Sequence, residues 1–194
     1  MRSIPLLALA AAAVAAAWLP QPLMAQDEDV FAFIPAGGRT LLTKVMDSHP
    51  PADEIKGLLT GKRTRDEWLS YLKAHAASVA ALRALSDKEQ LTLADYLSFN
   101  MPLPGGQAAI DPAKLPLDGR DYALEKCQGC HIITVVVTQS RPKEHWLGTM
   151  HKPSHIGIKL SEAQREQLAS YLVINAGIPI DQVPEELRAG GASY

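Results

Sequence analysis

The chain has few of the residues that build disulfide frameworks, β-sheets and strongly charged surfaces. It contains two cysteines in 194 residues, too few to staple a small secreted fold. Its formal net charge of -2 gives no electrostatic reason to bind nucleic acid. The one β-branched run is "HIITVVVT" at 131–138, and elsewhere apolar residues recur at helical spacing. The sequence therefore predicts an all-α protein.

The start of the chain has the layout of a secretory signal peptide. Arg2 precedes an apolar Leu/Ala stretch, and Ala25 stands directly before an acidic segment. This pattern predicts cleavage after Ala25. An uncleaved anchor over residues 4–19 is the alternative, since that run is only slightly short of a membrane span. Prolines interrupt the run, so we expect an exported, periplasmic protein without a stable membrane span after signal cleavage.

The remaining chain repeats one helical plan. "LSDKEQLTLADYL" (85–97) and "LSEAQREQLASYL" (160–172) share six of thirteen positions. "RDEWL" (65–69) likewise pairs with "KEHWL" (143–147), and "GRTLLTKV" (38–45) with "GRDYALEK" (119–126). Three matches in the same order indicate a duplication. Helices are predicted at 39–47, 65–82, 87–99, 120–128, 142–151 and 161–176, with Ser86 and Ser161 as N-caps.

The repeat suggests two small domains in tandem. We expect a first domain at 26–104, a Pro/Gly-rich linker at 105–118, a second domain at 119–180 and a C-terminal tail at 181–194. Only the second domain contains "CQGCH" (127–131); the first has "MDSHP" (46–50) at the corresponding place. The first domain therefore lacks the thiols for which the second is equipped.

Cys127, Cys130 and His131 form a Cys-x-x-Cys-His run, the attachment signature of c-type haem. Two thiols on one turn can bond the two vinyl-derived carbons of a porphyrin, and the adjacent imidazole can reach the iron. Zinc would need two further ligands from distant parts of the chain, and a redox dithiol would be expected near a βαβ pattern, which is lacking. The motif therefore favours one covalently attached haem c.

With "CQGCH", "EHWLGTM" and "LSEAQREQLASYL", the chain resembles the class I c-type cytochromes, especially the haem domains that serve periplasmic dehydrogenases. The resemblance covers about residues 117–176, and residues 36–100 only through the internal repeat. It implies a cytochrome c-like fold in both domains, with the first degenerate and free of haem. It also implies that His131 is the proximal iron ligand and that a methionine after the tryptophan helix is the sixth.

Met150 is the first candidate for that sixth ligand. It follows Trp146 by only four residues, closer than is usual in the family, so His155 is the main alternative. His151 and His145 are further candidates. The choice matters because a thioether opposite histidine raises the reduction potential, whereas a second imidazole lowers it. The apolar residues 132–137 are expected to line the haem crevice.

The function that follows is electron transfer, as the electron-accepting partner or cytochrome subunit of a periplasmic dehydrogenase, or as a donor to a terminal electron acceptor. Residues 119–160 carry six Lys/Arg and three acidic residues, a basic excess that could steer an acidic redox partner. Two alternatives remain. One is a haem enzyme with an open or displaceable sixth site; the other is a docking or assembly subunit that uses the haem-free half as its interface. No nucleophile–base pair or phosphate loop points to other enzymatic chemistry.

Overall fold

The computed structural model describes residues 29–106, 110–129, 132–155 and 157–188. These residues form helices and connecting segments without a β-strand, which confirms the predicted all-α class. The predicted signal peptide, residues 1–25, lies outside the described residues. Within them, no helix combines the length and apolar character that crossing a bilayer requires.

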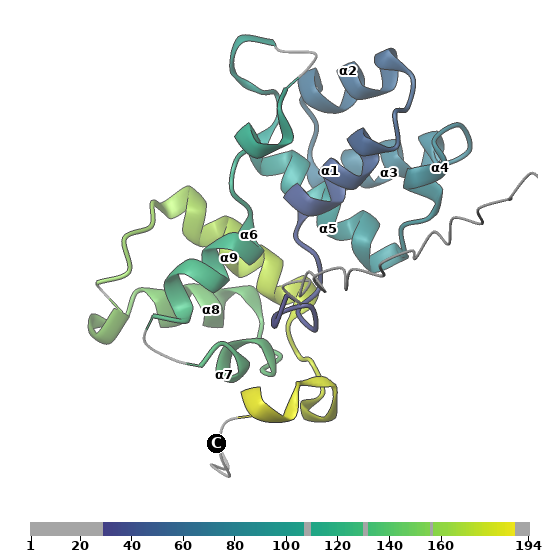
Figure 1. The fold of residues 1–194 in the computed structure, drawn as a ribbon. Helices are drawn as coiled ribbons and strands as arrows, with labels where there is room; N and C mark the ends of the chain where they lie inside the picture. The colour runs from purple at the N-terminus through teal and green to yellow at the C-terminus, as the bar shows by residue number, and fades with distance from the viewer. Residues whose placement is uncertain (1–28, 107–109, 130–131, 156, 189–194) are drawn as a thin grey trace, which may run out of the picture.

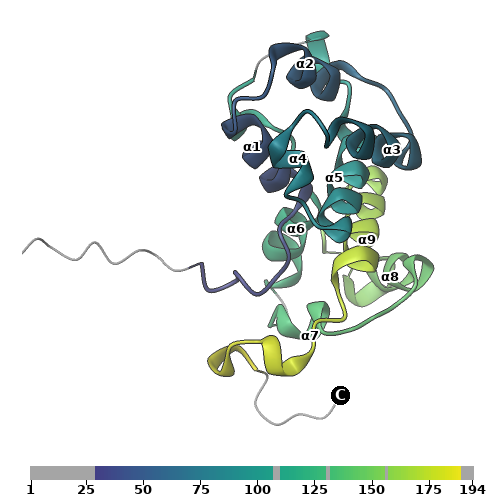
Figure 2. The same ribbon diagram turned by 90° about the vertical axis from the view of Figure 1, so that its right-hand side faces the viewer.

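The helices fall into two groups, which Figures 1 and 2 show on either side of the contact between α5 and α9. The first helix group comprises α1 (Gly38–Asp47), α2 (Ala52–Thr60), α3 (Arg65–His75), α4 (Ala80–Arg83) and α5 (Asp87–Asn100). The second helix group comprises α6 (Gly119–Tyr122), α7 (Thr134–Val137), α8 (Lys143–Met150) and α9 (Glu162–Asn175), with a π-helical turn, η3 (Ala123–Cys127), after α6.

Each helix group encloses its own apolar core. The core of the first group includes Leu41, Leu42, Trp68, Leu72, Leu93 and Leu97. The core of the second includes Tyr122, Ile133, Trp146, Met150, Leu168 and Leu172. Burial of each such side chain contributes about 1.5–3 kcal/mol. The predicted boundaries of cytochrome-like domains remain predictions, but the apolar residues do separate into two clusters.

Corresponding helices in the two groups make corresponding contacts. Gly38 of α1 lies against Tyr96 of α5, and Gly119 of α6 lies against Tyr171 of α9, so closely that a Cβ on either glycine would overlap the tyrosine Cβ. α5 and α9 both begin at a capping box, with Ser86 and Ser161 as the N-caps, as expected from the sequence. These contacts occur at the positions that the sequence repeat pairs.

The segments that precede the two groups pack against the opposite group. Ile34, ahead of α1, is buried in the second core, and Leu115, ahead of α6, is buried in the first. The Tyr171 hydroxyl donates to the Pro35 carbonyl at 2.6 Å, and the Tyr96 hydroxyl donates to the Pro116 carbonyl at 2.9 Å. This exchange of segments holds the two helix groups together. α5 and α9 also form side-chain hydrogen bonds directly with each other.

Candidate functional site

The described part of the Cys-x-x-Cys-His motif begins at the end of the π-helical turn. Cys127 is the last residue of η3 and is partly exposed. π-Helical turns occur mostly as single-turn bulges, frequently at functional sites. Cys130 and His131, the second predicted thiol and the predicted proximal ligand, lie outside the described residues. Cys127 therefore fixes where the motif enters the second helix group.

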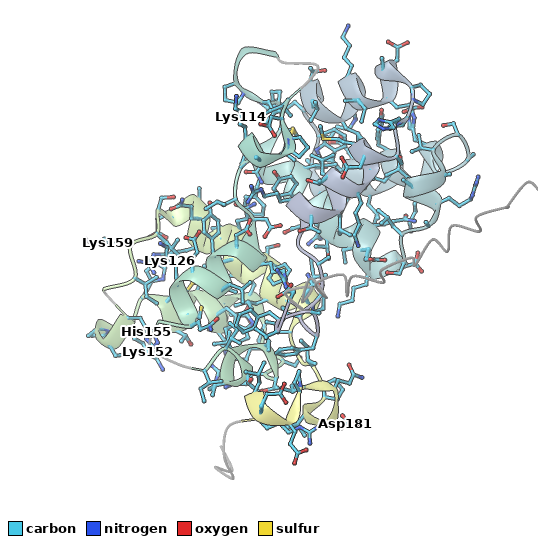
Figure 3. The ribbon with its side chains drawn as sticks, viewed as in Figure 1. Lys114, Lys126, Lys152, His155, Lys159 and Asp181 are labelled. Atoms are coloured by element: carbon cyan, nitrogen blue, oxygen red, sulfur yellow. The ribbon has the colours of Figure 1, made fainter. Side chains whose placement is uncertain are left out.

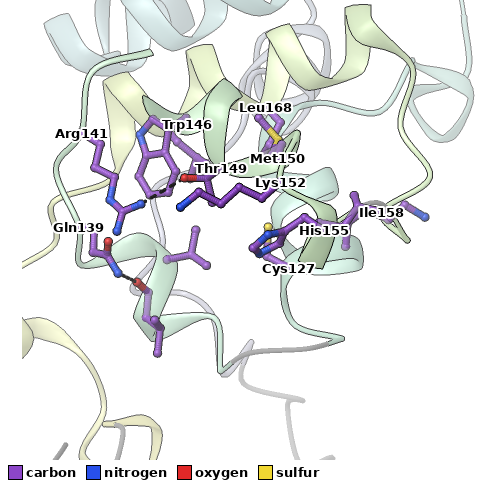
Figure 4. A pocket seen from close by; sticks show the side chains of 14 residues that line it. Cys127, Gln139, Arg141, Trp146, Thr149, Met150, Lys152, His155, Ile158 and Leu168 are labelled. Carbon is purple, nitrogen blue, oxygen red and sulfur yellow. Dashed lines mark hydrogen bonds between the residues drawn. The ribbon is translucent and has the colours of Figure 1, made fainter. Parts of the chain in front are cut away.

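Cys127 lies on the wall of a mainly apolar cavity of about 270 Å³, shown in Figure 4. The wall is built from helices η3, α7, α8 and α9 and from the segments before and after α8. Its apolar part consists of Val135, Val136, Trp146, Met150, Ile158, Leu168 and Leu172. A concave apolar site with a few polar groups is the usual form of a cofactor pocket.

Met150 lies on this cavity at the end of α8. Its side chain is 6% exposed, and it packs in the second core with Trp146 one helical turn earlier. The predicted sixth ligand is thus buried on the same cavity as the predicted thioether cysteine. A buried thioether is also common as core filler, so its place beside Cys127 is the informative observation.

The three candidate histidines occupy different environments. His155, in the short helix η4 (Pro153–His155), lines the cavity, and Figure 4 shows its ring beside Cys127. His151 lies on the outer surface: Nδ1 is 2.8 Å from the Leu147 carbonyl and Nε2 is 3.2 Å from the Glu162 carboxylate. Those hydrogen bonds, first the one to Glu162, raise the pKa of His151. His145 is not among the residues that line the cavity.

The apolar run after the motif contributes to the cavity only in part. Val135 and Val136 line it, as expected for residues 132–137. Ile133 and Val137 instead pack in the second core, and Ile132 is half exposed. The run forms the short helix α7, in which successive side chains point in different directions.

Cationic side chains surround the mouth of the cavity. Lys126, Arg141 and Lys152 line it, and Figure 3 shows Lys126, Lys152, His155 and Lys159 on the same side of the second helix group. The Arg141 guanidinium lies 5.2 Å from the centre of the Trp146 ring and 3.4 Å from Thr149 Oγ1. Lys126 Nζ also lies 3.3 Å from Glu125 Oε2, so the positive charge of this basic rim is partly offset within the chain.

Comparisons with protein-family models, curated proteins and solved structures find no match. Assignment of the site therefore depends on its own chemistry. Among the residues described, no group of three or more His, Cys, Asp and Glu could hold a metal ion.

The residues present fit a covalently attached haem. A thiol, a buried thioether and an imidazole converge on one apolar cavity, with cations at its mouth. The indole Nε1 of Trp146 is buried without a hydrogen-bond partner in the part of the chain described, but the same holds for Trp68 in the first group. That atom therefore does not distinguish the two groups, whereas Cys127 and Met150 do.

The corresponding place in the first helix group is packed with its own side chains. Arg63 lies 4.5 Å from the centre of the Trp68 ring, as Arg141 lies over Trp146. Beside it, Tyr71 stacks on His75 at 3.9 Å between ring centres, and His75 Nδ1 is 2.6 Å from Glu54 Oε2. The sequence repeat places Leu72 where the second group has Met150, so this half has neither the thiol nor the thioether.

Several cavity residues were not anticipated from the sequence. Leu168 and Leu172 lie one turn apart on α9, a spacing that predicts a buried face but not which cavity it lines. Gln139, Thr149 and Ile158 carry no sequence signal for this site, since Thr149 lies on α8 and the other two in the segments on either side of it, and only the packing of α8 brings them to the cavity.

Proposed function

We propose that this chain is an exported c-type cytochrome that transfers single electrons through one haem held at the cavity beside Cys127. The observation that carries the proposal is the convergence on one apolar cavity of Cys127, the first residue of the Cys-x-x-Cys-His motif, with Met150 and His155. Neither the motif alone nor the cavity alone would indicate a covalently attached haem as specifically as the two together.

Each group in the site has a definite part in this proposal. Cys127 and Cys130 would hold the haem by thioether bonds, His131 would bind the iron on one side and Met150 on the other, with His155 as the alternative sixth ligand. The haem, when bound, supplies a reversible one-electron change. The apolar walls exclude water from it, which favours electron transfer over reaction with small molecules.

The predicted setting is the periplasm, after removal of residues 1–25. The partner would be a dehydrogenase that delivers electrons or an acceptor that removes them, and the chain itself would not catalyse a substrate reaction. Its basic cavity mouth is suited to an acidic partner surface. The first helix group would then support the haem-bearing group rather than carry electrons.

Haem content tests the proposal directly. A pyridine haemochrome assay on the exported protein should give one haem per chain, and replacement of both Cys127 and Cys130 by alanine should abolish covalent attachment. Absence of haem from the wild-type chain, despite co-expression of a haem-attachment system, would contradict the proposal.

Substitution of methionine identifies the sixth ligand. Met150→Leu should keep the haem, because leucine fills a similar volume. It should lose the weak far-red absorption band that arises from charge transfer between the methionine sulfur and ferric iron. Met101→Leu is a matched control, since Met101 is equally buried in the first core. His155→Leu should leave the band intact. A band that persists in Met150→Leu, or a wild-type haem that has no such band, would contradict the assignment of Met150.

A further inference from the structure

Arg165 joins α9 to both ends of the loop that follows α8. Arg165 is only 9% exposed, although its guanidinium carries a permanent charge. Nη1 donates to the Met150 carbonyl at 2.8 Å, and Nη2 donates to the Ile158 carbonyl at 2.9 Å. A planar guanidinium holds two acceptors in a fixed relation that a single-point donor does not reproduce.

Both acceptors lie on residues of the cavity. Met150 and Ile158 line it, and His155 lies between them in sequence. The Met150 carbonyl is also at the carboxyl end of α8, where helix carbonyls lack partners within the helix. Arg165 therefore satisfies this end of α8 while fixing the backbone from which the Met150 side chain extends.

An ion pair does not account for the burial of Arg165. Its nearest carboxylate is Glu162, at 3.8 Å from Nε, and the Glu162 side chain is 74% exposed. An exposed pair at that distance contributes little stability. Burial of a guanidinium is costly unless its hydrogen bonds are made, so the two carbonyls are its main compensation.

The first helix group offers a natural comparison. The sequence repeat aligns Arg165 with Gln90, which is also buried; its single Nε2 donates to the Leu85 carbonyl at 3.2 Å and, more weakly, to the Leu82 carbonyl at 3.5 Å. A neutral amide thus performs the corresponding local task in the half without the thiols. The charged guanidinium, with two separate donor nitrogens, occurs in the helix group that has Met150 at the position of Leu72.

We propose that Arg165 is a positioning residue that holds Met150 in place as an iron ligand through its hydrogen bonds to the Met150 and Ile158 carbonyls. The inference rests on the proposed haem function and goes beyond it, because it concerns how the ligand is retained. Without these two hydrogen bonds the Met150 backbone would be less restrained, so its sulfur would be exchanged more readily for an added ligand.

Three variants of the holoprotein test this role: Arg165→Met, Arg165→Lys and, as control, Gln90→Met. Haem content is measured first, then the far-red sulfur band, and then the imidazole concentration that displaces the band. Arg165→Met should keep its haem. Its sulfur band should either be absent or be displaced at an imidazole concentration at least about tenfold lower than in wild type. Arg165→Lys should be intermediate, because it keeps the charge but not both hydrogen bonds, and Gln90→Met should resemble wild type.

Each other outcome is decisive. If Arg165→Met retains haem, band and imidazole sensitivity of the wild type, Arg165 does not position the ligand. If Gln90→Met weakens the band as much, the effect is one of general stability and the inference fails. A wild-type chain that has haem but no sulfur band also overturns the inference while the haem function stands; a chain without haem instead overturns the proposed function.

Discussion

Asp95 is a buried acid at the contact between the two helix groups. Asp95 is 6% exposed, and its Oδ1 accepts a hydrogen bond from Ser170 Oγ at 2.6 Å. Burial raises the pKa of Asp95, and the Ser170 hydrogen bond offsets part of that rise. The folded chain therefore holds the Asp95 proton to a higher pH than the unfolded chain does.

This raised pKa predicts a pH-dependent cost to stability. Since the folded state binds more protons, the free energy of unfolding falls as pH rises from the ordinary aspartate pKa through the raised one. Asp95→Asn removes the charge but can still accept from Ser170, so it should stabilise the protein at neutral pH by on the order of 1 kcal/mol. Urea unfolding of both proteins over a pH series checks this, and the gain should disappear at acid pH.

Ser170→Ala tests the cause of the effect. It removes the donor that lowers the Asp95 pKa, so it should reduce stability at neutral pH in the wild-type background. In the Asp95→Asn background the loss should be smaller, because no carboxylate is then left without its donor. Equal losses in both backgrounds would show that the carboxylate charge is not involved.

The sequence ranks Met150 first among the candidate sixth ligands and His155 second, and that ranking stays a prediction. Cys127 follows from the motif, whereas Met150 follows from the family resemblance and His155 from its place in the loop after it; all three lie on one cavity. His151 ranks below His155 in the sequence, but its contact with Glu162 of the next long helix could not be predicted, because it depends on how α8 and α9 pack. Arg165 was missed for the same reason: an arginine on a helix reads as a surface residue until its backbone acceptors are placed.

At the level of helices, two glycines determine how closely the paired helices approach. A Cβ at Gly119 would overlap the Cβ of Tyr171, and one at Gly38 would overlap that of Tyr96. Gly119→Ala and Gly38→Ala should each lower the free energy of unfolding by about 1–3 kcal/mol, because the helices must separate to admit a methyl group. Chemical denaturation with a far-ultraviolet circular dichroism readout would measure the change.

Gly148 provides the control for those two glycines. It lies within α8, and a Cβ there would meet no atom within 4 Å. Gly148→Ala should therefore raise stability by up to about 1 kcal/mol through helix propensity alone. A loss at Gly148 similar to that at Gly119 would indicate that close helix approach is not the reason for the glycines.

The helices were predicted well where local signals agree. α1, α5, α8 and α9 match their expected ranges to within about two residues. Helical spacing of apolar residues marks all four, and serine N-caps also mark the starts of α5 and α9. The helix expected over 65–82 ends at His75 and resumes at Ala80. α2 was missed, although Pro51 at its N-cap and the acidic residues in its first turn are helix-start signals. Residues 134–137 form a short helix despite their β-branched side chains, since packing overrides intrinsic propensity.

On the scale of the whole molecule, the exchanged segments were beyond sequence reasoning. Ile34 and Leu115 are ordinary apolar residues in segments that were assigned to a domain edge and a linker. Each is buried in the core of the opposite helix group. Nothing in local pattern specifies which of two similar cores a segment joins, because that depends on how the groups face each other.

The distribution of charge around the cavity mouth has a consequence for the whole molecule. Lys126, Arg141 and Lys152 line the cavity, whereas the chain as a whole has a formal net charge of -2. If electrons enter and leave at this mouth, the local field and not the net charge governs the approach of a charged reagent. The reduced protein should therefore react faster with an anionic oxidant than its overall charge would suggest.

Stopped-flow oxidation by ferricyanide and by the tris(phenanthroline)cobalt(III) cation tests this at two ionic strengths. Lys152→Glu should slow the reaction with ferricyanide and speed that with the cobalt cation in about 0.01 M salt, and both effects should vanish near 1 M, where the Debye length falls to about 3 Å. Lys114→Glu makes the same change of net charge far from the cavity (Figure 3) and should have little effect. Equal effects of the two substitutions would mean that net charge controls the rate and that electrons do not pass through this mouth.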